Sequence, residues 1–376
     1  MQRAVLLALA ACARVAAAPP NLFGAIRWDA FVNSSSDPGD PGQVVARVLR
    51  PPVWHNRLPW FTYTDPVSGN VTFNGAAPDV MDAEIEMAVA AGIDHWAFDV
   101  YPDDTDLAAA LHAYLNSTSP ARAELFFCLL LQASWMANGG LSGWPAKVAV
   151  YAAHFARPSY RVVLGNRPLV YLFGAGERDW NSSAVSGWAD WAAALGVLSN
   201  ASLAAGRGLP YVVLQVWEAR QGAAFVAGVN GAAKSEAIAA LSSYALLGAT
   251  DAGTPWDDFA SQGESFWDSL AATGLNVIPT VAAGWDDRPR NMTPVPWQAF
   301  TDPAFVLGPT PAQLGAFVQR AESWTARNAA ANPACVHLLS AWNEYDEGHW
   351  IGAVLPEFGG NARLDAIGAV LRGRKA

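Results

Sequence analysis

The chain reads PDVMDAEIEMAVAAGIDHWAFDV from Pro78 to Val100, and from this unit its fold can be predicted. The first part, Pro78–Ala91, is alanine-rich with an amphipathic pattern, which predicts a helix. The second part, Ile93–Val100, is a short apolar run rich in aromatic and branched residues, which is typical of a buried strand. A helix joined to a buried strand indicates a parallel sheet covered by helices.

The same alternation continues in both directions along the chain. We predict strands at Phe23–Trp28, Ile93–Val100, Leu125–Gln132, Leu169–Phe173, Tyr211–Trp217, Ile238–Leu246, Val277–Ala282 and Val336–Ala341. We predict helices at Pro78–Ala91, Asp106–Leu115, Pro145–Phe155, Ala184–Leu198, Ala223–Glu236, Trp256–Ala272, Pro311–Ala329 and Leu364–Leu371. Eight strands alternating with eight helices predict an α/β protein of the (β/α)₈ or TIM-barrel class, formed by residues 19–376 as a single domain.

The largest interruption of this rhythm runs from Val32 to Ala77. Within it, Trp60–Thr64 and Val71–Phe73 flank the turn-rich sequence Asp65–Asn70, which predicts a β-hairpin. The hairpin would be inserted in the first βα loop, and such loops lie on the face where barrel active sites form. Two interpretations stay open: a wall of a substrate groove, or a hairpin without a functional role.

Composition narrows the class of partner. The chain has 376 residues, 52% of them hydrophobic and 15% charged, so it can bury a large core. Its net charge is −10 and it lacks clustered lysine and arginine, which argues against a nucleic-acid partner. Its seventeen tryptophans suit the apolar faces of sugar rings, although large rings more often fill cores.

The N-terminus resembles a secretory leader. Met1–Arg3 is followed by the apolar stretch Ala4–Ala13 and the small residues Ala16–Ala18, so we predict a signal peptide at residues 1–18. The apolar stretch is too short to span a bilayer, and no membrane span is expected once it is removed. A secreted or lumenal location agrees with six Asn-Xaa-Ser/Thr sequons, at Asn33, Asn70, Asn116, Asn181, Asn200 and Asn291.

Two cysteines remain after loss of this leader, Cys128 and Cys335, and both lie in apolar strand-like runs. In an oxidising lumen they could form one disulfide, but we favour two buried thiols. No metal-ligand spacing of cysteine and histidine occurs, and we expect neither a metal nor another cofactor.

Residues that follow parallel strands meet on one face of a barrel, so the candidate site can be assembled from the predicted strand ends. Carboxylates and aromatic rings dominate there, as sugar binding requires. The predicted substrate-binding residues are Trp28, Asp99, Tyr101, Trp135, Trp217, Tyr244, Trp285, Asp286, Arg290 and Asn343.

The segment Ala341-Trp-Asn-Glu-Tyr-Asp-Glu-Gly348 follows the eighth strand and holds the best pair of catalytic carboxylates, Glu344 and Glu347. Residues three apart on a helical turn have neighbouring side chains, so one substrate could contact both. Glycoside hydrolysis uses two such carboxyl groups, and their proximity pushes the two pKa values apart. The alternative is a helix N-cap with an acidic first turn, which would place the same residues for helix stability alone. His349, beside the pair, is a weaker candidate for substrate contact.

This segment resembles the Asn-Glu-Trp-Xaa-Glu-Gly motif of family 99 glycoside hydrolases, the endo-α-mannosidases, and of the related WbsX-like proteins. Gly284-Trp-Asp-Asp-Arg-Pro-Arg290 is similar to a second WbsX-like motif, in the right order after the seventh strand. The resemblance implies a retaining hydrolase of α-mannosides. It also implies that Glu344 acts as a base on the sugar 2-hydroxyl, giving an anhydro-sugar intermediate, and that Glu347 is the general acid/base.

The first strand, Gly24-Ala-Ile-Arg-Trp-Asp29, departs from the tyrosine-rich start usual in these families, so the sugar stays open. Three functions are kept. The first is a metal-independent, secreted or lumenal retaining glycosidase acting on α-linked oligosaccharides or polysaccharides, with α-mannosides as the leading candidates. The second is a WbsX-like glycosyltransferase of polysaccharide synthesis, although no glycine-rich phosphate loop is evident. The third is a non-catalytic carbohydrate-binding barrel.

Overall fold

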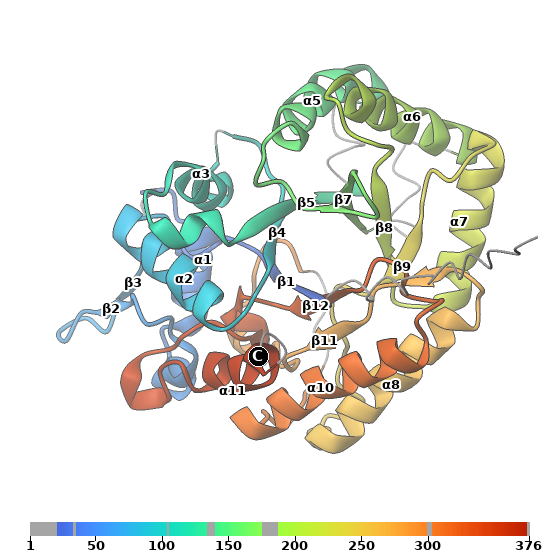
Figure 1. Cartoon of the computed structure of the whole chain (residues 1–376). Helices are drawn as coiled ribbons and strands as arrows, with labels where there is room; N and C mark the ends of the chain where they lie inside the picture. The colour runs from blue at the N-terminus through green and yellow to red at the C-terminus, as the bar shows by residue number, and fades with distance from the viewer. Residues whose placement is uncertain are drawn as a thin grey trace, which may run out of the picture.

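The computed structural model of the chain describes residues 21–32, 35–103, 105–133, 140–174, 187–298 and 303–373. At its centre lies a parallel sheet surrounded by helices (Figure 1). The strands of this sheet are β1 (Leu22–Arg27), β4 (His95–Asp99), β5 (Phe126–Gln132), β7 (Arg167–Phe173), β8 (Tyr211–Gln215), β9 (Ala240–Ser242), β10 (Asn276–Val277), β11 (Thr280–Ala282) and β12 (Val336–Ser340). A short strand β6 (Val162–Val163) pairs antiparallel with β7.

The sheet closes because β10 and β11 are two segments of one barrel strand. β10 pairs in parallel with β9, and β11 pairs in parallel with β12, so the sheet β10-β9-β8-β7-β5-β4-β1-β12-β11 returns to the strand where it begins. Pro279 lies between the two segments and has no N–H to donate to a ladder, which accounts for the break within the predicted strand Val277–Ala282. The predicted (β/α)₈ barrel is confirmed.

Helices cover the outside of the sheet in sequence order (Figure 1). They are α2 (Pro78–Ala90), α3 (Ala109–Asn116), α5 (Gly140–Phe155), α6 (Trp188–Ala204), α7 (Ala219–Ala233), α8 (Trp256–Ala271), α10 (Pro311–Arg327) and α11 (Ala362–Arg372). Helix α7 begins four residues before the predicted start at Ala223, because the Glu218 carboxylate accepts hydrogen bonds from Arg220 N and Gln221 N and caps the helix there.

The Pro78–Val100 unit shows how the barrel is held together. Helix α2 buries Met81, Ile85 and Ala88 against the sheet, and every residue of β4 is buried. Gly92 joins the two elements with a φ of +80°, a conformation that glycine adopts without strain. A Cβ at Gly92 would lie 3.0 Å from the Cβ of Leu371, so glycine also lets α11 pack beside α2 and complete the ring of helices.

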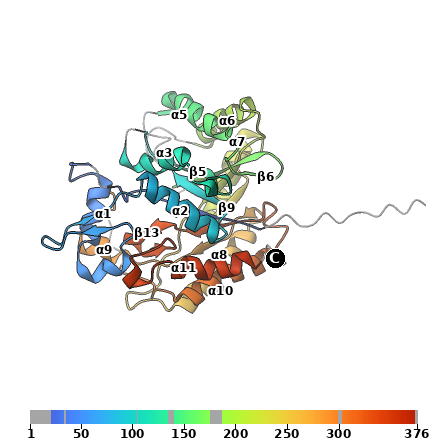
Figure 2. The same cartoon turned by 60° about the vertical axis from the view of Figure 1, so that its left-hand side comes forward.

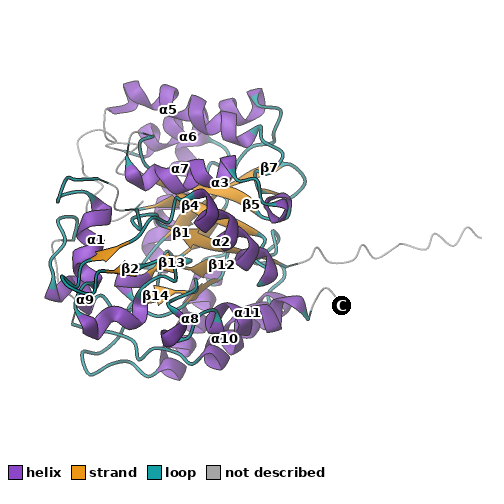
Figure 3. Cartoon of the chain, turned by 90° about the vertical axis from the view of Figure 1, so that its left-hand side faces the viewer, coloured by secondary structure: helices purple, strands orange, loops and turns teal. Residues whose placement is uncertain are grey.

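The first βα loop carries the predicted hairpin, formed by β2 (Tyr63–Thr64) and β3 (Val71–Thr72) in antiparallel register. The sequence reading missed a helix in the same loop, α1 (Pro41–Leu49), which the Asp40 side chain caps. Figures 2 and 3 show α1 and the hairpin gathered at one end of the barrel with the short helix α9 (Arg288–Met292) and the hairpin strands β13 (Asn343–Glu344) and β14 (His349–Trp350). The insertion therefore covers the loops that follow β11 and β12.

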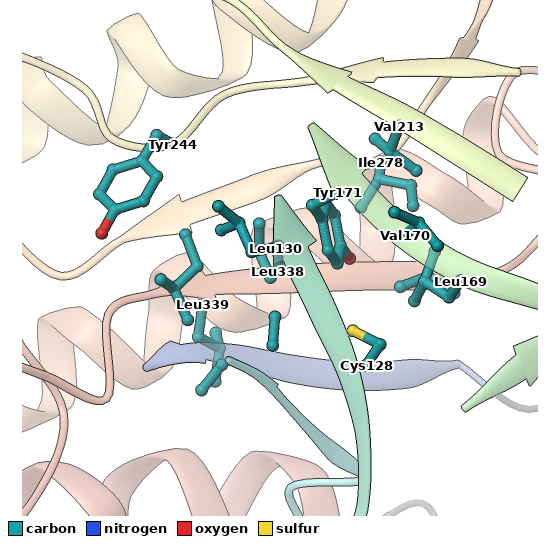
Figure 4. Packing of buried hydrophobic residues seen from close by; sticks show 14 of the residues in the cluster. Cys128, Leu130, Leu169, Val170, Tyr171, Val213, Tyr244, Ile278, Leu338 and Leu339 are labelled. Atoms are coloured by element: carbon teal, nitrogen blue, oxygen red, sulfur yellow. The ribbon is translucent and has the colours of Figure 1, made fainter. Parts of the chain in front are cut away.

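Apolar side chains fill the barrel and the space between the sheet and its helices. Leu130, Tyr171 and Leu339 meet in this core (Figure 4). Cys128 is buried among them, and Cys335 is partly exposed just before β12; both are free thiols. The favoured interpretation of two thiols agrees with this arrangement, although Cys335 is less buried than expected.

The predicted leader, residues 1–18, lies outside the described residues. In the described part of the chain, no helix combines the length and the apolar character needed to cross a membrane. Among the sequon asparagines, Asn70, Asn116 and Asn200 are exposed and Asn291 is partly buried, whereas Asn33 and Asn181 fall outside the described ranges.

Candidate active site

A cavity of about 550 Å³ opens where the barrel strands end at their carboxyl side. Its lining combines acidic groups with large aromatic rings. The residues that line it are Trp28, Pro41, Asp99, Tyr101, Leu107, Gln132, Phe173, Trp217, Tyr244, Trp285, Arg290, Trp297, Gln298, Glu344 and Glu347. A cleft of this size, with a few convergent polar groups among aromatic rings, has the character of a small-molecule site.

The segment after β12 delivers the two glutamates as a tight hairpin and not as a helix. Glu344 ends β13 and pairs with His349 of β14, and a three-residue 3₁₀ turn, Tyr345–Glu347, connects the two strands. Gly348 closes the turn with a φ of +77°, and a Cβ on it would lie 2.7 Å from Asp286 N. No α-helix begins at Asn343 in the described chain, so the helix-cap interpretation is wrong.

Glu344 is buried, and two neighbouring side chains contact its carboxylate. The Tyr244 hydroxyl donates a hydrogen bond to Oε1, and His349 Nε2 lies 3.3 Å from Oε2. Burial raises the pKa of Glu344, but the charge and hydrogen bond of His349, the charge of Arg290 and the Tyr244 hydroxyl together outweigh it and hold the pKa below its usual value. Glu344 is therefore ionised at neutral pH.

Glu347 lies across the hairpin from Glu344 and is the more accessible of the two, with 14% of its side chain exposed. Arg290 Nη1 donates to its Oε1, and His349 Nε2 lies 2.8 Å from its Oε2. Oxygen atoms of Glu344 and Glu347 and a ring nitrogen of His349 all lie within 4.8 Å of one another. One substrate atom can thus be reached by both carboxylates.

His349 positions this pair. Its Nδ1 lies 3.0 Å from Ser340 Oγ, and its ring is 5.3 Å from that of Trp285. With Nδ1 bonded to the serine hydroxyl, a proton on Nε2 faces both carboxylates. The ring is fully buried and both of its nitrogen atoms lie against protein side chains, so the structure places His349 against the two glutamates; its suggested contact with substrate stays a prediction. His349 reaches the carboxylates because it pairs with Glu344 across the hairpin. The five-residue separation of the two in the sequence does not predict this pairing.

The opposite wall of the cavity is a chain of hydrogen bonds around Asp99. Gln132 Nε2 donates to Asp99 Oδ2 and to the Tyr101 hydroxyl oxygen, both at 2.7 Å, and Trp28 Nε1 donates to the same hydroxyl oxygen at 2.8 Å. Burial raises the pKa of Asp99 well above its usual value, and the charge of Glu344 acts in the same direction. Asp99 Oδ1 is buried and has no hydrogen-bond partner among the described residues, so it is available to a bound hydroxyl.

Seven of the predicted substrate-binding residues line this cavity together with both predicted catalytic glutamates. They are Trp28, Asp99, Tyr101, Trp217, Tyr244, Trp285 and Arg290. Tyr244 leaves β9 with its hydroxyl directed away from the packed core (Figure 4). Trp217 stands at the rim with 37% of its surface exposed, and Trp135 lies outside the described residues.

Two predicted residues do not line the cavity. Asn343 is buried behind it, where its Oδ1 accepts from Trp28 N and its Nδ2 donates to Asp29 Oδ1, so it fixes the hairpin to the end of β1. Asp286 turns away and pairs with Arg57 and Arg288. In an irregular loop, the direction in which each side chain points depends on the folded backbone. The sequence alone therefore does not show which loop residues face the cavity.

The sequence reading also left out several residues that line the cavity. Gln132, Phe173, Trp297 and Gln298 are the clearest of these. Gln132 is the last residue of β5, and the strand-end rule does bring it to this face, although the predicted substrate-binding set did not include it. Trp297 and Gln298 come from a loop well beyond the end of β11, and no pattern marks them.

Glu344, Glu347 and His349 have the donor atoms and the spacing that could hold a metal ion. Arg290 forms an ion pair with Glu347 and so places a positive charge beside the same oxygen atoms. A cation at this position would therefore meet electrostatic repulsion unless Arg290 moved.

Comparisons with known proteins bear on the fold. No family profile matches the chain, and no curated protein matches it in sequence. Among solved structures, a family 99 endo-α-mannosidase from Bacteroides thetaiotaomicron superimposes with a TM-score of 0.58 at 12% identity, covering 94% of this chain and 97% of the other. A glycoside hydrolase-like protein gives 0.61 at 15% identity, covering 93% and 94%. The chain thus shares its barrel with family 99 structures over nearly its whole length.

Proposed function

We propose that this protein is a retaining glycoside hydrolase that acts on α-linked oligosaccharides or polysaccharides, with α-mannosides as its leading substrates. The observation that carries the proposal is the placement of Glu344 and Glu347, whose carboxylate oxygens approach within 4.8 Å inside an aromatic-lined cavity of a (β/α)₈ barrel. Retaining glycosidases hold their two carboxyl groups about 5–5.5 Å apart, whereas inverting enzymes leave about 6.5–9.5 Å for a water molecule. The short separation supports retention.

The surroundings of the two glutamates suggest different roles. Glu344 is buried and ionised, because its pKa is held below its usual value, so it is free to accept a proton, which in the related enzymes comes from the sugar 2-hydroxyl. Glu347 is more exposed and lies nearer the mouth of the site, where it can reach the leaving oxygen and later a water molecule. Asp99 Oδ1, Gln132 and Tyr101 are placed to bind sugar hydroxyls, and Trp285 and Trp217 to stack on ring faces.

A screen of released sugars tests the proposal. Wild type, Glu344→Gln and Glu347→Gln are incubated with α-mannan, with N-glycan substrates and with other α-linked glycans, each with and without a chelator. Glu264→Gln is the matched control, because Glu264 forms a surface ion pair with Arg320 on the outer helices. We expect wild type and the control to release sugars with retained anomeric configuration, and the two site variants to fail.

The same screen separates the alternatives. Loss of activity on chelation would favour a glycosyltransferase that depends on a cation. Binding of glycans without turnover by wild type would favour a carbohydrate-binding barrel. Hydrolysis that survives both site substitutions would overturn the assignment of Glu344 and Glu347.

We also propose that the protein is secreted or resides in the lumen of the secretory pathway. The charged and apolar start of the chain supports this, as do the exposed sequon asparagines Asn70, Asn116 and Asn200. Expression in a eukaryotic host, followed by enzymatic removal of N-glycans, is the test. A fall in apparent mass of the secreted protein is expected, and a protein retained in the cytosol without glycans would contradict the proposal.

A further inference from the structure

A second cavity, of about 680 Å³, lies beside the candidate active site on the same face of the barrel. Residues from the segments 53–57, 286–288, 305–311 and 348–363 form its walls. The cavity shares no lining residue with the candidate active site. The two are nevertheless adjacent, because Asp286, which lines this cavity, donates through its backbone N–H to the carbonyl oxygen of Glu347, which lines the other, at 2.7 Å. We call it the arginine pocket.

Its charge is the reverse of the chain as a whole. Three arginines, Arg57, Arg288 and Arg363, line the pocket with one carboxylate, Asp286, in a protein whose net charge is −10. Asp286 already pairs with both Arg57 and Arg288. Two positive charges in the lining are therefore left without a counter-charge from the lining itself.

Arg363 is the clearest case of an uncompensated charge. Its guanidinium lies 3.8 Å above the Trp350 ring and donates to the Trp350 carbonyl oxygen at 2.5 Å, and no carboxylate among the described residues forms an ion pair with it. Burial lowers the pKa of Arg363 to about 9, and the charge of Arg57 acts in the same direction. At neutral pH the group is still charged, so the protein holds a cation where its surroundings disfavour one.

The remainder of the lining also suits an anion attached to an apolar surface. Helices α10 and α11 both begin at the pocket, at Pro311 and Ala362, and their N-terminal ends carry partial positive charge. Phe358 adds aromatic surface at the edge, where it is 43% exposed. Trp54 and Phe305 also line the pocket, but Arg57 and Arg288 lie over their rings. Arginine forks recognise planar carboxylates and sulfates through paired hydrogen bonds, and aromatic rings stack on sugar faces.

We propose that the arginine pocket binds the anionic substituent, a carboxylate or a sulfate ester, of a sugar unit, and that the natural substrate is therefore an acidic glycan. The second clause rests on the proposed glycosidase function, because it places the charged unit in the arginine pocket and the bond to be cleaved in the neighbouring cavity. The first clause requires no catalysis.

Binding of three monosaccharides that share one ring tests the proposal without depending on turnover: galactose, galacturonic acid and galactose 6-sulfate. Calorimetry at neutral pH and low salt compares wild type with Arg363→Gln and with Arg288→Gln, a partly exposed arginine of the same pocket. The matched control is Arg122→Gln, because Arg122 also stacks on an aromatic ring, Tyr114 at 3.8 Å, but lies before β5 at the other end of the barrel. Inorganic sulfate is the fourth probe.

We expect at least one acidic sugar to bind wild type at least about tenfold more tightly than galactose, which is the scale of one or two charged hydrogen bonds. Arg363→Gln and Arg288→Gln should each remove most of that preference, and Arg122→Gln should leave it intact. The acidic sugar that binds more tightly shows whether the pocket prefers a carboxylate or a sulfate ester.

Equal binding of all three sugars, or equal losses in Arg363→Gln and Arg122→Gln, would overturn the proposal. Inorganic sulfate that binds as tightly as the acidic sugars would show an adventitious ion only and would also overturn it. If an acidic sugar binds as expected but no glycan is hydrolysed, the proposed function fails and the binding site stands.

Discussion

The active-site cavity and the arginine pocket are lined by nearly opposite sets of charged residues. The first is lined by three carboxylates, Asp99, Glu344 and Glu347, with one arginine, Arg290. The second is lined by three arginines with one carboxylate, Asp286. Both take part of their lining from Gly284-Trp-Asp-Asp-Arg-Pro-Arg290, which gives Trp285 and Arg290 to one cavity and Asp286 and Arg288 to the other.

The difference shows two ways of keeping like charges close together. In the active site, Glu344 and Glu347 share His349, and each has a further donor, Tyr244 or Arg290. In the arginine pocket, the guanidinium groups lie over aromatic rings, Arg57 over Trp54 at 4.8 Å and Arg363 over Trp350 at 3.8 Å. Hydrogen bonds hold the carboxylates in position, whereas the arginines combine stacking on aromatic rings with hydrogen bonds. Arg57 and Arg288 donate to Asp286, and Arg363 donates through Nη1 to the Trp350 carbonyl oxygen.

The largest effect is expected from loss of the proposed base, Glu344, in the candidate active site. Glu344→Gln keeps the shape and the Tyr244 contact but removes the ionised group, so kcat on a hydrolysed glycan should fall by about 10²–10⁴-fold, the usual contribution of a positioned acid or base. The measurement is initial-rate kinetics with a thermal melt to confirm folding. A variant that keeps wild-type kcat would remove Glu344 from the mechanism.

The single carboxylate of the arginine pocket should matter for folding. Asp286→Asn leaves the buried guanidinium of Arg57 without its ion-pair partner, and breaking a buried pair in this way costs about 3–5 kcal/mol. Urea unfolding gives the free energy of unfolding. Asp365→Asn, an exposed aspartate on α11, is the control and should change that energy by less than about 0.5 kcal/mol. Similar values for both variants would show that the pocket does not depend on Asp286.

Tyr244→Phe should shift the pH dependence of activity without abolishing it. The hydroxyl helps to hold the pKa of Glu344 below its usual value, so its loss raises that pKa and moves the acidic limb of the pH–rate profile upward. On that limb, activity should fall by up to about tenfold, the effect of one hydrogen bond to a charged group. Tyr171→Phe is the control, since the Tyr171 hydroxyl is buried and has no partner among the described residues.

The same substitution carries a consequence for stability. A carboxyl whose pKa is lower in the folded state contributes stability that is present above its unfolded pKa and is lost as pH falls through the folded value. Tyr244→Phe should therefore lose stability at neutral pH and converge with wild type in acid. A constant difference at every pH would contradict the role given to the hydroxyl.

The smallest effect is expected from Asp99→Asn. The pKa of Asp99 is raised in the folded state, so wild type should lose stability as pH rises from the unfolded value of this carboxyl through the raised one. The variant lacks that loss, and its melting temperature relative to wild type should increase with pH by a few degrees at most. A difference that shrinks as pH rises would show that Asp99 is ionised in the folded protein.

Strand ends predicted most of the residues that line the candidate site, because a parallel barrel brings the ends of its strands to one face. Trp28, Asp99, Tyr101 and Tyr244 were found in this way, and all line the cavity. The rule failed for side chains that belong to loops. Asp286 and Asn343 lie within the right segments but face other partners, and Trp297 comes from a loop that no strand marks.

The sequence by itself determined the barrel, the inserted hairpin and the two glutamates, because periodicity and the order of elements are local properties that survive into the fold. Tertiary structure decided the rest. His349 reaches both carboxylates through the β13–β14 pairing, and the arginine pocket gathers Arg57, Arg288 and Arg363 from three segments far apart in the chain. Charge compensation of this kind depends on distances between segments, and a linear pattern contains no such distances.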